Sequence, residues 1–201
     1  MTEISNLSAA YLIDAVREDL GDVAGLFEDP QLLRFLNEGQ RRLEPEVARE
    51  RVSTLTWVAN ATEAALPADL ISITGIEPAD TASTVPGRYR VHGGTMYLDQ
   101  RDTTYAFTGR LYYRAHFPQI SDTADSLVPP AAGDALVSFA LYRAFHRVAS
   151  NRSVYKRYST LTQNGVTVAE LEGIATNHLA DFTDVKTLAQ NLEAPSFFYE
   201  D

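Results

Sequence analysis

The 201-residue sequence contains no cysteine. This absence excludes disulfides, thiolate nucleophiles and cysteine-rich zinc sites. It also lacks any apolar run near the eighteen or so residues of a membrane span, and the N-terminal MTEISNL carries an acid where a signal peptide needs basic residues. We therefore expect a soluble protein that is made in the cytoplasm and has no membrane partner.

Recognisable catalytic and cofactor motifs are also missing. There is no Gly-x-Ser-x-Gly and no glycine-rich phosphate loop. The histidines are dispersed, without the spacing of metal ligands: His92, His116, His146 and His178. Asp99 and Asp102 are the best candidates for a carboxylate pair, but they read more simply as hairpin turn residues. We predict no catalytic residue, no metal, no cofactor and no enzymatic activity.

Helical patterns occupy both ends of the chain. Ser8 precedes AAYLIDAVREDLG, whose apolar residues recur at helical spacing. Asp29 and Pro30 open a second amphipathic helix that should end near Pro45. A last helix, VAELEGIATNHLADF, begins after Thr167, with Glu170 three residues later as a capping box.

Between these helices the hydrophobic period changes from 3.6 to 2. Short segments rich in β-branched and aromatic residues follow one another from Val52 to Phe117: VSTLTWVA, DLISITGI, RYRVHG, TMYLDQ, YAFTG and RLYYRAHF. The sequence HGGT at 92–95 predicts a tight hairpin, because adjacent glycines accept positive φ. About six strands should form a small antiparallel sandwich or barrel.

The stretch from Gly133 to Arg157 is the expected main core helix, since apolar residues mark one broad face up to Val148. Its C-terminal part is strongly basic in a chain whose formal net charge is -10. Five cations stand there with no acid among them: Arg143, Arg147, Arg152, Lys156 and Arg157. They indicate either a surface that meets negative charge or a solvated helix face whose cations suit the C-terminal dipole.

The C-terminus ends in adjacent aromatics between acids. Phe197, Phe198 and Tyr199, which follow Pro195, would be costly to leave in water, since burial of each aromatic ring stabilises by about 1.5–3 kcal/mol. They should fold back or dock on another chain.

The predicted fold class is α+β, a bundle of about four helices with an inserted antiparallel β lobe and an extended C-terminal tail. The expected parts are helices in 1–51, β lobe in 52–118, helices in 119–180 and tail in 181–201.

Three blocks taken together resemble the head-to-tail connector adaptor proteins of tailed bacteriophages. They are LLRFLNEGQRRLE, LPADLISITGI with YRVHGGTMYLDQ, and ALVSFALYRAFHRVASNRSVYKRYSTLTQNG. The resemblance implies a structural virion protein of the neck, present in the host cytoplasm before assembly, that forms a closed and usually dodecameric ring under the portal. It also implies that the C-terminal segment clasps the portal, that a stopper or tail protein follows, and that genomic DNA passes the lumen without specific binding.

A closed ring needs two different complementary patches on each subunit. Our hypothesis from the residues is that the basic stretch 143–157 meets acids around the second helix, such as Glu38, Glu44, Glu46 and Glu50, with apolar contacts giving most of the affinity. The cations could equally contact the portal.

Two other readings remain open at this point. One is a tail-completion or stopper protein of the same neck, although such proteins are usually smaller and mostly β. The other is a carbohydrate-binding or hydrolytic β module, in which strand aromatics line a cleft: Trp57, Tyr89, Tyr97, Tyr105, Tyr112 and Tyr113.

Overall fold

A computed structural model describes residues 7–21, 25–47, 49–79, 85, 88–99, 104–129, 132–163 and 165–191. They divide into two compact units. The described residues up to Val47 and from Phe117 onward form a helical unit, and those of 49–116 form a β unit. The division falls two to four residues before the expected boundaries at 51 and 118. The chain is α+β as predicted.

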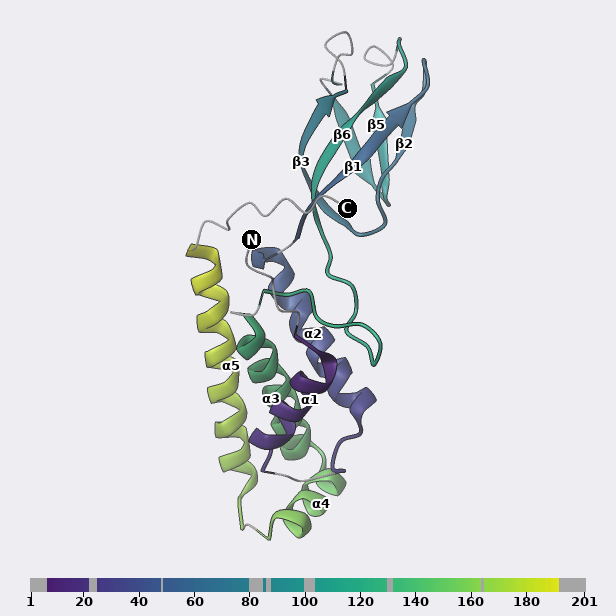
Figure 1. Ribbon diagram of the computed structural model, residues 1–201. Helices are drawn as coiled ribbons and strands as arrows, with labels where there is room; N and C mark the ends of the chain where they lie inside the picture. The colour runs from purple at the N-terminus through teal and green to yellow at the C-terminus, as the bar shows by residue number, and fades with distance from the viewer. Residues whose placement is uncertain are drawn as a thin grey trace, which may run out of the picture. The chain divides into compact units, whose positions relative to one another are not determined.

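The helical unit has five helices in the described residues, against about four expected. They are α1 (Ala9–Asp19), α2 (Asp29–Val47), α3 (Gly133–Ser150), α4 (Arg152–Thr162) and α5 (Val168–Asn191). Figure 1 shows α3 in the middle of this unit, with α2 and α5 on either side. The interior is lined by large apolar side chains with no exposure, among them Leu12, Leu36, Phe139 and Leu171.

Local signals place two of the helix starts as expected. The Ser8 hydroxyl oxygen accepts the Tyr11 N–H at 3.1 Å before α1. Before α5, the Glu170 carboxylate accepts the Thr167 N–H at 2.8 Å, and the Thr167 hydroxyl accepts the Glu170 N–H at 3.3 Å. These hydrogen bonds confirm the N-cap and the capping box, which satisfy backbone N–H groups that a helix start leaves unpaired.

Three helix boundaries differ from the prediction. The stretch 133–157 is two helices, because the Asn151 side chain accepts the N–H groups of Ser153 and Val154 and starts α4. Helix α2 continues two residues past Pro45. Helix α5 continues to Asn191, so the segment expected to be extended from residue 181 is helical at first. Phe182, at the start of this continuation, is buried against Phe139 with ring centroids 5.0 Å apart, and Lys186, one turn further on, pairs with Glu46.

The β unit consists of two three-stranded antiparallel sheets and no closed barrel in its described part. One sheet has the order β1-β6-β3, from Arg49–Trp57, Phe107–Ala115 and Leu70–Pro78. The other has the order β2-β5-β4, from Glu63–Ala65, Thr95–Leu98 and Tyr89–His92. Side chains of both sheets share one apolar cluster that includes Leu55, Leu111 and Met96.

Two strand assignments correct the sequence reading. YAFTG and RLYYRAHF are one strand, β6, and Gly109 lies inside it. A Cβ there would lie 2.3 Å from the Glu77 carbonyl oxygen, so this glycine permits close packing and marks no turn. The short strand β2 was not predicted. The hairpin at 92–95 is confirmed, since Gly93 and Gly94 have φ of 59° and 76°.

Candidate interaction surfaces

The side chains of α2 that face the returning chain form a polar stripe. Asn37, Gln40 and Glu44 are spaced about one helical turn apart, and each bonds to the backbone of the segment 117–120. Asn37 donates to the Ile120 carbonyl at 2.9 Å and accepts the Ile120 N–H at 2.8 Å. Gln40 donates to the Pro118 carbonyl at 2.9 Å. The stripe supplies hydrogen-bond partners to the backbone of residues 117–120, as a neighbouring strand would. These polar groups therefore fix the returning segment against α2 and do not offer a ligand site.

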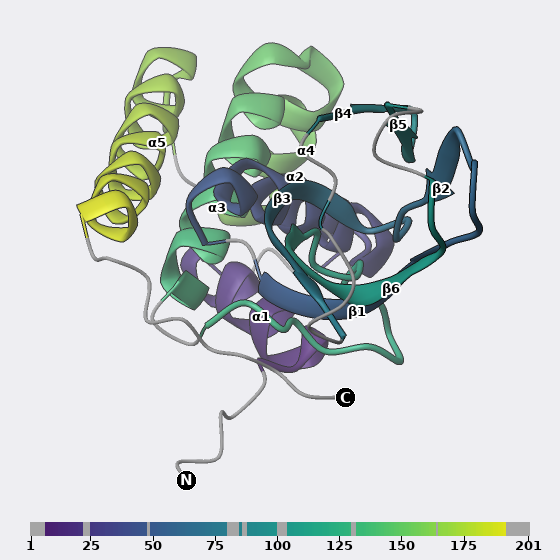
Figure 2. The same ribbon diagram turned by 90° about the horizontal axis from the view of Figure 1, so that it is seen from above.

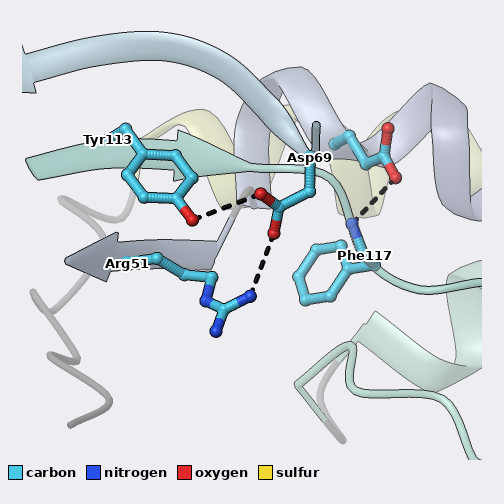
Figure 3. Close-up of polar contacts among 5 residues, drawn as sticks. Arg51, Asp69, Tyr113 and Phe117 are labelled. Atoms are coloured by element: carbon cyan, nitrogen blue, oxygen red, sulfur yellow. Dashed lines mark hydrogen bonds and ion pairs between the residues drawn. The ribbon is translucent and has the colours of Figure 1, made fainter. Parts of the chain in front are cut away.

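Glu44 ends this stripe and is nearly fully buried. Its Oε1 accepts the Phe117 N–H at 3.1 Å, the contact at the right of Figure 3. Two other α2 acids named in the charge hypothesis also have partners in the chain. Glu38 Oε2 lies 3.1 Å from Arg143 Nε, and Glu46 Oε1 lies 3.3 Å from Lys186 Nζ. The α2 acids are therefore engaged within the subunit, and Glu50 lies in β1 of the β unit.

The five cations of the basic stretch fall into two groups, two in α3 and three in α4. Arg143 is half-buried, pairs with Glu38 and places its guanidinium 6.0 Å from the Phe35 ring centroid, so it serves the helical core. Arg147 stands in the last turn of α3, where the helix dipole favours a cation. The other three belong to α4 and are exposed: Arg152, Lys156 and Arg157. Of these, Arg157 donates to the Gly25 carbonyl at 2.6 Å.

A surface that the sequence reasoning missed is the outer face of α1. Tyr11, Asp14 and Glu18 are exposed and follow one another by about one helical turn. Arg17, beside them in sequence, pairs with Asp29 instead. The sequence pattern does indicate this face, since three polar or aromatic residues at 11, 14 and 18 stand opposite the apolar positions 12, 13 and 16 of the helix. This face is acidic, whereas that of α4 is basic.

A polar cluster joins the strands at one end of the β unit (Figure 3). Asp69, just before β3, accepts from Arg51 Nη1 at 3.0 Å and from the Tyr113 hydroxyl at 3.2 Å. Burial, followed by the negative charge of Asp69, raises the pKa of Tyr113 above its ordinary value of 10.0. A phenol held protonated cannot act as a base near neutral pH. The cluster ties β1, β6 and the start of β3 together.

The aromatics proposed as a carbohydrate platform do not share a surface. Trp57 is 6% exposed and stacks on Phe107, with ring centroids 4.1 Å apart and an interplanar angle of 11°. Tyr113 is also buried in the core, whereas Tyr105 is 81% exposed. The side chain at the centre of the hypothesis therefore belongs to the interior. Asp99 is exposed, and Asp102, its suggested carboxylate partner, lies outside the described residues.

Within the described part of the chain, no group of three or more His, Asp or Glu side chains gathers as a metal site would require. Among the helices of that part, none combines the length and the apolar composition needed to cross a bilayer. The predicted tail residues Pro195, Phe197, Phe198 and Tyr199 lie outside the described residues.

A family model described as SU10 adaptor protein matches residues 7–180, which is most of the chain and spans both units. The chain belongs to the SU10 adaptor protein family. It is therefore a structural adaptor protein of a bacteriophage and a component of the virion. An adaptor of this kind interacts with other head or tail proteins of the phage, and its family is not a class of enzymes. No curated protein matches this adaptor.

Proposed function

We propose that this adaptor forms a closed ring in the neck of the virion, beneath the portal, and joins the portal to a stopper or tail protein. The observation that carries the proposal is the pair of unlike faces on the helical unit, an acidic one on α1 and a basic one on α4. A closed cyclic assembly requires two different complementary patches on every subunit, whereas a twofold dimer requires one self-complementary patch.

The DNA passage is the second part of the proposal. The chain has 27 acidic and 17 basic residues, and its formal net charge is -10. A ring of such subunits repels phosphate on average, so the genome would slide through the lumen instead of adhering to it. We propose twelve copies, the number expected from the resemblance to neck adaptors, with no specific DNA contact.

The third part concerns the C-terminal residues. We propose that Pro195, Phe197, Phe198 and Tyr199 dock on the portal. Burial of one such ring contributes about 1.5–3 kcal/mol, and 1.4 kcal/mol corresponds to a tenfold change in affinity. Removal of all three rings should therefore weaken portal binding by well over tenfold.

The deletion of residues 194–201 tests this part. We expect an unchanged far-UV circular dichroism spectrum and unfolding midpoint, with reduced binding to the cognate portal ring in sedimentation. A variant of full length, with Phe197, Phe198 and Tyr199 replaced by serine, keeps the chain length and charge and should show the same loss. Unfolding of either variant would place the aromatics in the core of the subunit, and undiminished portal binding would remove their docking role.

The position in the neck needs a separate measurement. The mass of the adaptor with and without its portal ring should show a defined ring on the portal, and images of the virion should place that ring directly under it. A ring found one layer further from the portal would make the protein a stopper. A virion neck without this chain would refute the proposal.

A further inference from the structure

Helix α4 carries a positive charge at its N-terminal end, which is also the positive end of its own dipole. Arg152 is the first residue of the helix, and its first turn contains no acid. The positive end of a helix dipole lies there, so a cation is locally unfavourable. Lys156 follows one turn later on the same exposed side. Within the described residues, neither side chain has a carboxylate in ion-pair distance.

Helix α1 shows the same conflict with the opposite sign. Glu18 and Asp19 lie in its last turn, at the negative end of its dipole. Asp14 lies one turn before Glu18 on the outer face, and Tyr11, 59% exposed, lies one turn before that. Where the structure describes the chain, Asp14 and Glu18 also lack a cationic partner. Each face is electrostatically incomplete within one subunit, and each is complementary to the other.

We propose that the outer face of α1 in one copy packs antiparallel on the exposed face of α4 in the next copy. The spacing supports a single register. Glu18 and Asp14 are four residues apart, as are Arg152 and Lys156, which corresponds to about 6 Å along either helix. With Glu18 opposite Arg152 and Asp14 opposite Lys156, Tyr11 falls near the end of α4.

In this register Tyr11 falls opposite Ser159, next to the exposed Thr160, on the same side of α4 as Arg152 and Lys156. Exposed ion pairs add little affinity by themselves but fix orientation and reject wrong partners. The antiparallel arrangement also sets the negative end of α1 against the positive end of α4. The charges therefore determine which surfaces meet and in which orientation.

A second copy can supply the missing partner of each face. In the view of Figure 2, α1 and α4 lie on different sides of α3, and among the described residues no ion pair joins the two faces within one subunit. A contact between unlike faces of successive copies leaves a free α1 face and a free α4 face at the two ends, which propagates until a ring closes. This inference rests on the proposed ring and names the surfaces that build it.

Charge reversal tests the pairing. One variant carries Asp14→Lys with Glu18→Lys, and a second carries Arg152→Glu with Lys156→Glu. At about 50 mM salt each alone should self-associate at least about tenfold more weakly than the native chain, because like charges then face each other. A 1:1 mixture of the two variants should assemble again, with alternating subunits. One chain carrying all four reversals should also assemble.

Mass photometry with and without the portal ring gives the readout, and circular dichroism checks that each variant is folded. The loss should shrink near 0.5 M salt, where the screening length is about 4 Å. A matched control for the second variant, Arg41→Glu with Arg90→Glu, lowers the net charge by the same four units at exposed positions outside the two faces. This control should assemble like the native chain.

The outcomes separate the interface from the ring. If the native chain forms rings and both reversed variants do so equally, the proposed interface is wrong and the ring remains. If the variants fail alone and their mixture fails too, α1 and α4 do not pair. Loss of portal binding with intact self-association would make α4 a portal contact, which also overturns the pairing. A native chain that never assembles, even with portal, refutes both proposals.

Discussion

A single methyl group added to α2 should reveal how closely α2 and α3 approach. Gly39 is buried in α2, and a Cβ built there would lie 3.0 Å from Cδ1, 3.1 Å from Cβ and 3.2 Å from Cγ of Phe139. Replacement of a helical glycine by alanine normally stabilises by about 1 kcal/mol through helix propensity. Overpacking of a full core costs about 1–3 kcal/mol. The sign of Gly39→Ala depends on whether Phe139 can move.

The structure indicates that Phe139 cannot move. Phe139 has no exposure and its ring is held on several sides, with the Phe182 centroid at 5.0 Å, the Tyr142 centroid at 5.7 Å and the Arg42 guanidinium carbon at 5.0 Å. The Cβ of Phe139 is among the close atoms, and it moves only with the backbone of α3. We therefore expect Gly39→Ala to lower the free energy of unfolding by about 1 kcal/mol, since the packing cost exceeds the propensity gain.

Urea unfolding followed by far-UV circular dichroism measures this change in the helical unit. Gly173→Ala is the matched control, because Gly173 is exposed in α5 and a Cβ there meets nothing within 4 Å. That variant should gain about 0.5–1 kcal/mol from propensity alone. Equal stabilisation by both alanines would refute the close approach of α2 and α3.

Two further predictions concern single polar contacts. The unfolded chain releases the Tyr113 proton near pH 10.0, before the folded chain does, so stability falls as pH rises above that value. Tyr113→Phe should flatten this fall, measured as the urea midpoint of Trp57 fluorescence at about pH 8 and pH 10.5; an unchanged slope would contradict the assigned role. Thr167→Ala removes the cap of α5 and should lower the free energy of unfolding by about 1 kcal/mol, measured by urea unfolding with circular dichroism. Thr167→Ser keeps the hydroxyl and should retain most of the native stability, so equal losses in the two variants would argue against the hydroxyl contact.

Local features of the fold were predictable because their chemistry lies within a few residues. Ser8 caps α1, Thr167 and Glu170 cap α5, and adjacent glycines turn the hairpin between β4 and β5. Asn151 also acts locally as the N-cap of α4, but the long apolar pattern before SNRS favours one continuous helix. The β unit was predictable as a change of hydrophobic period, although the pairing of its strands was not.

The interaction surfaces were less accessible from sequence. Five cations in one stretch suggested one surface, but Arg143 faces α2 and pairs with Glu38. Whether a charge is free or already neutralised depends on residues about a hundred positions away. The acidic face of α1 had a helical pattern in the sequence, yet its significance depends on its location across α3 from α4.

The sequence by itself determined the α+β class, the insertion of strands between helices, the absence of cysteine chemistry and the main caps, since composition, periodicity and short-range hydrogen bonds act along the chain. Only the tertiary structure decided that Gly109 lies inside a strand, that α5 continues past Phe182, and which charges remain exposed. The physical reason is that burial and charge pairing depend on neighbours in space, which distant segments supply only after the chain has folded.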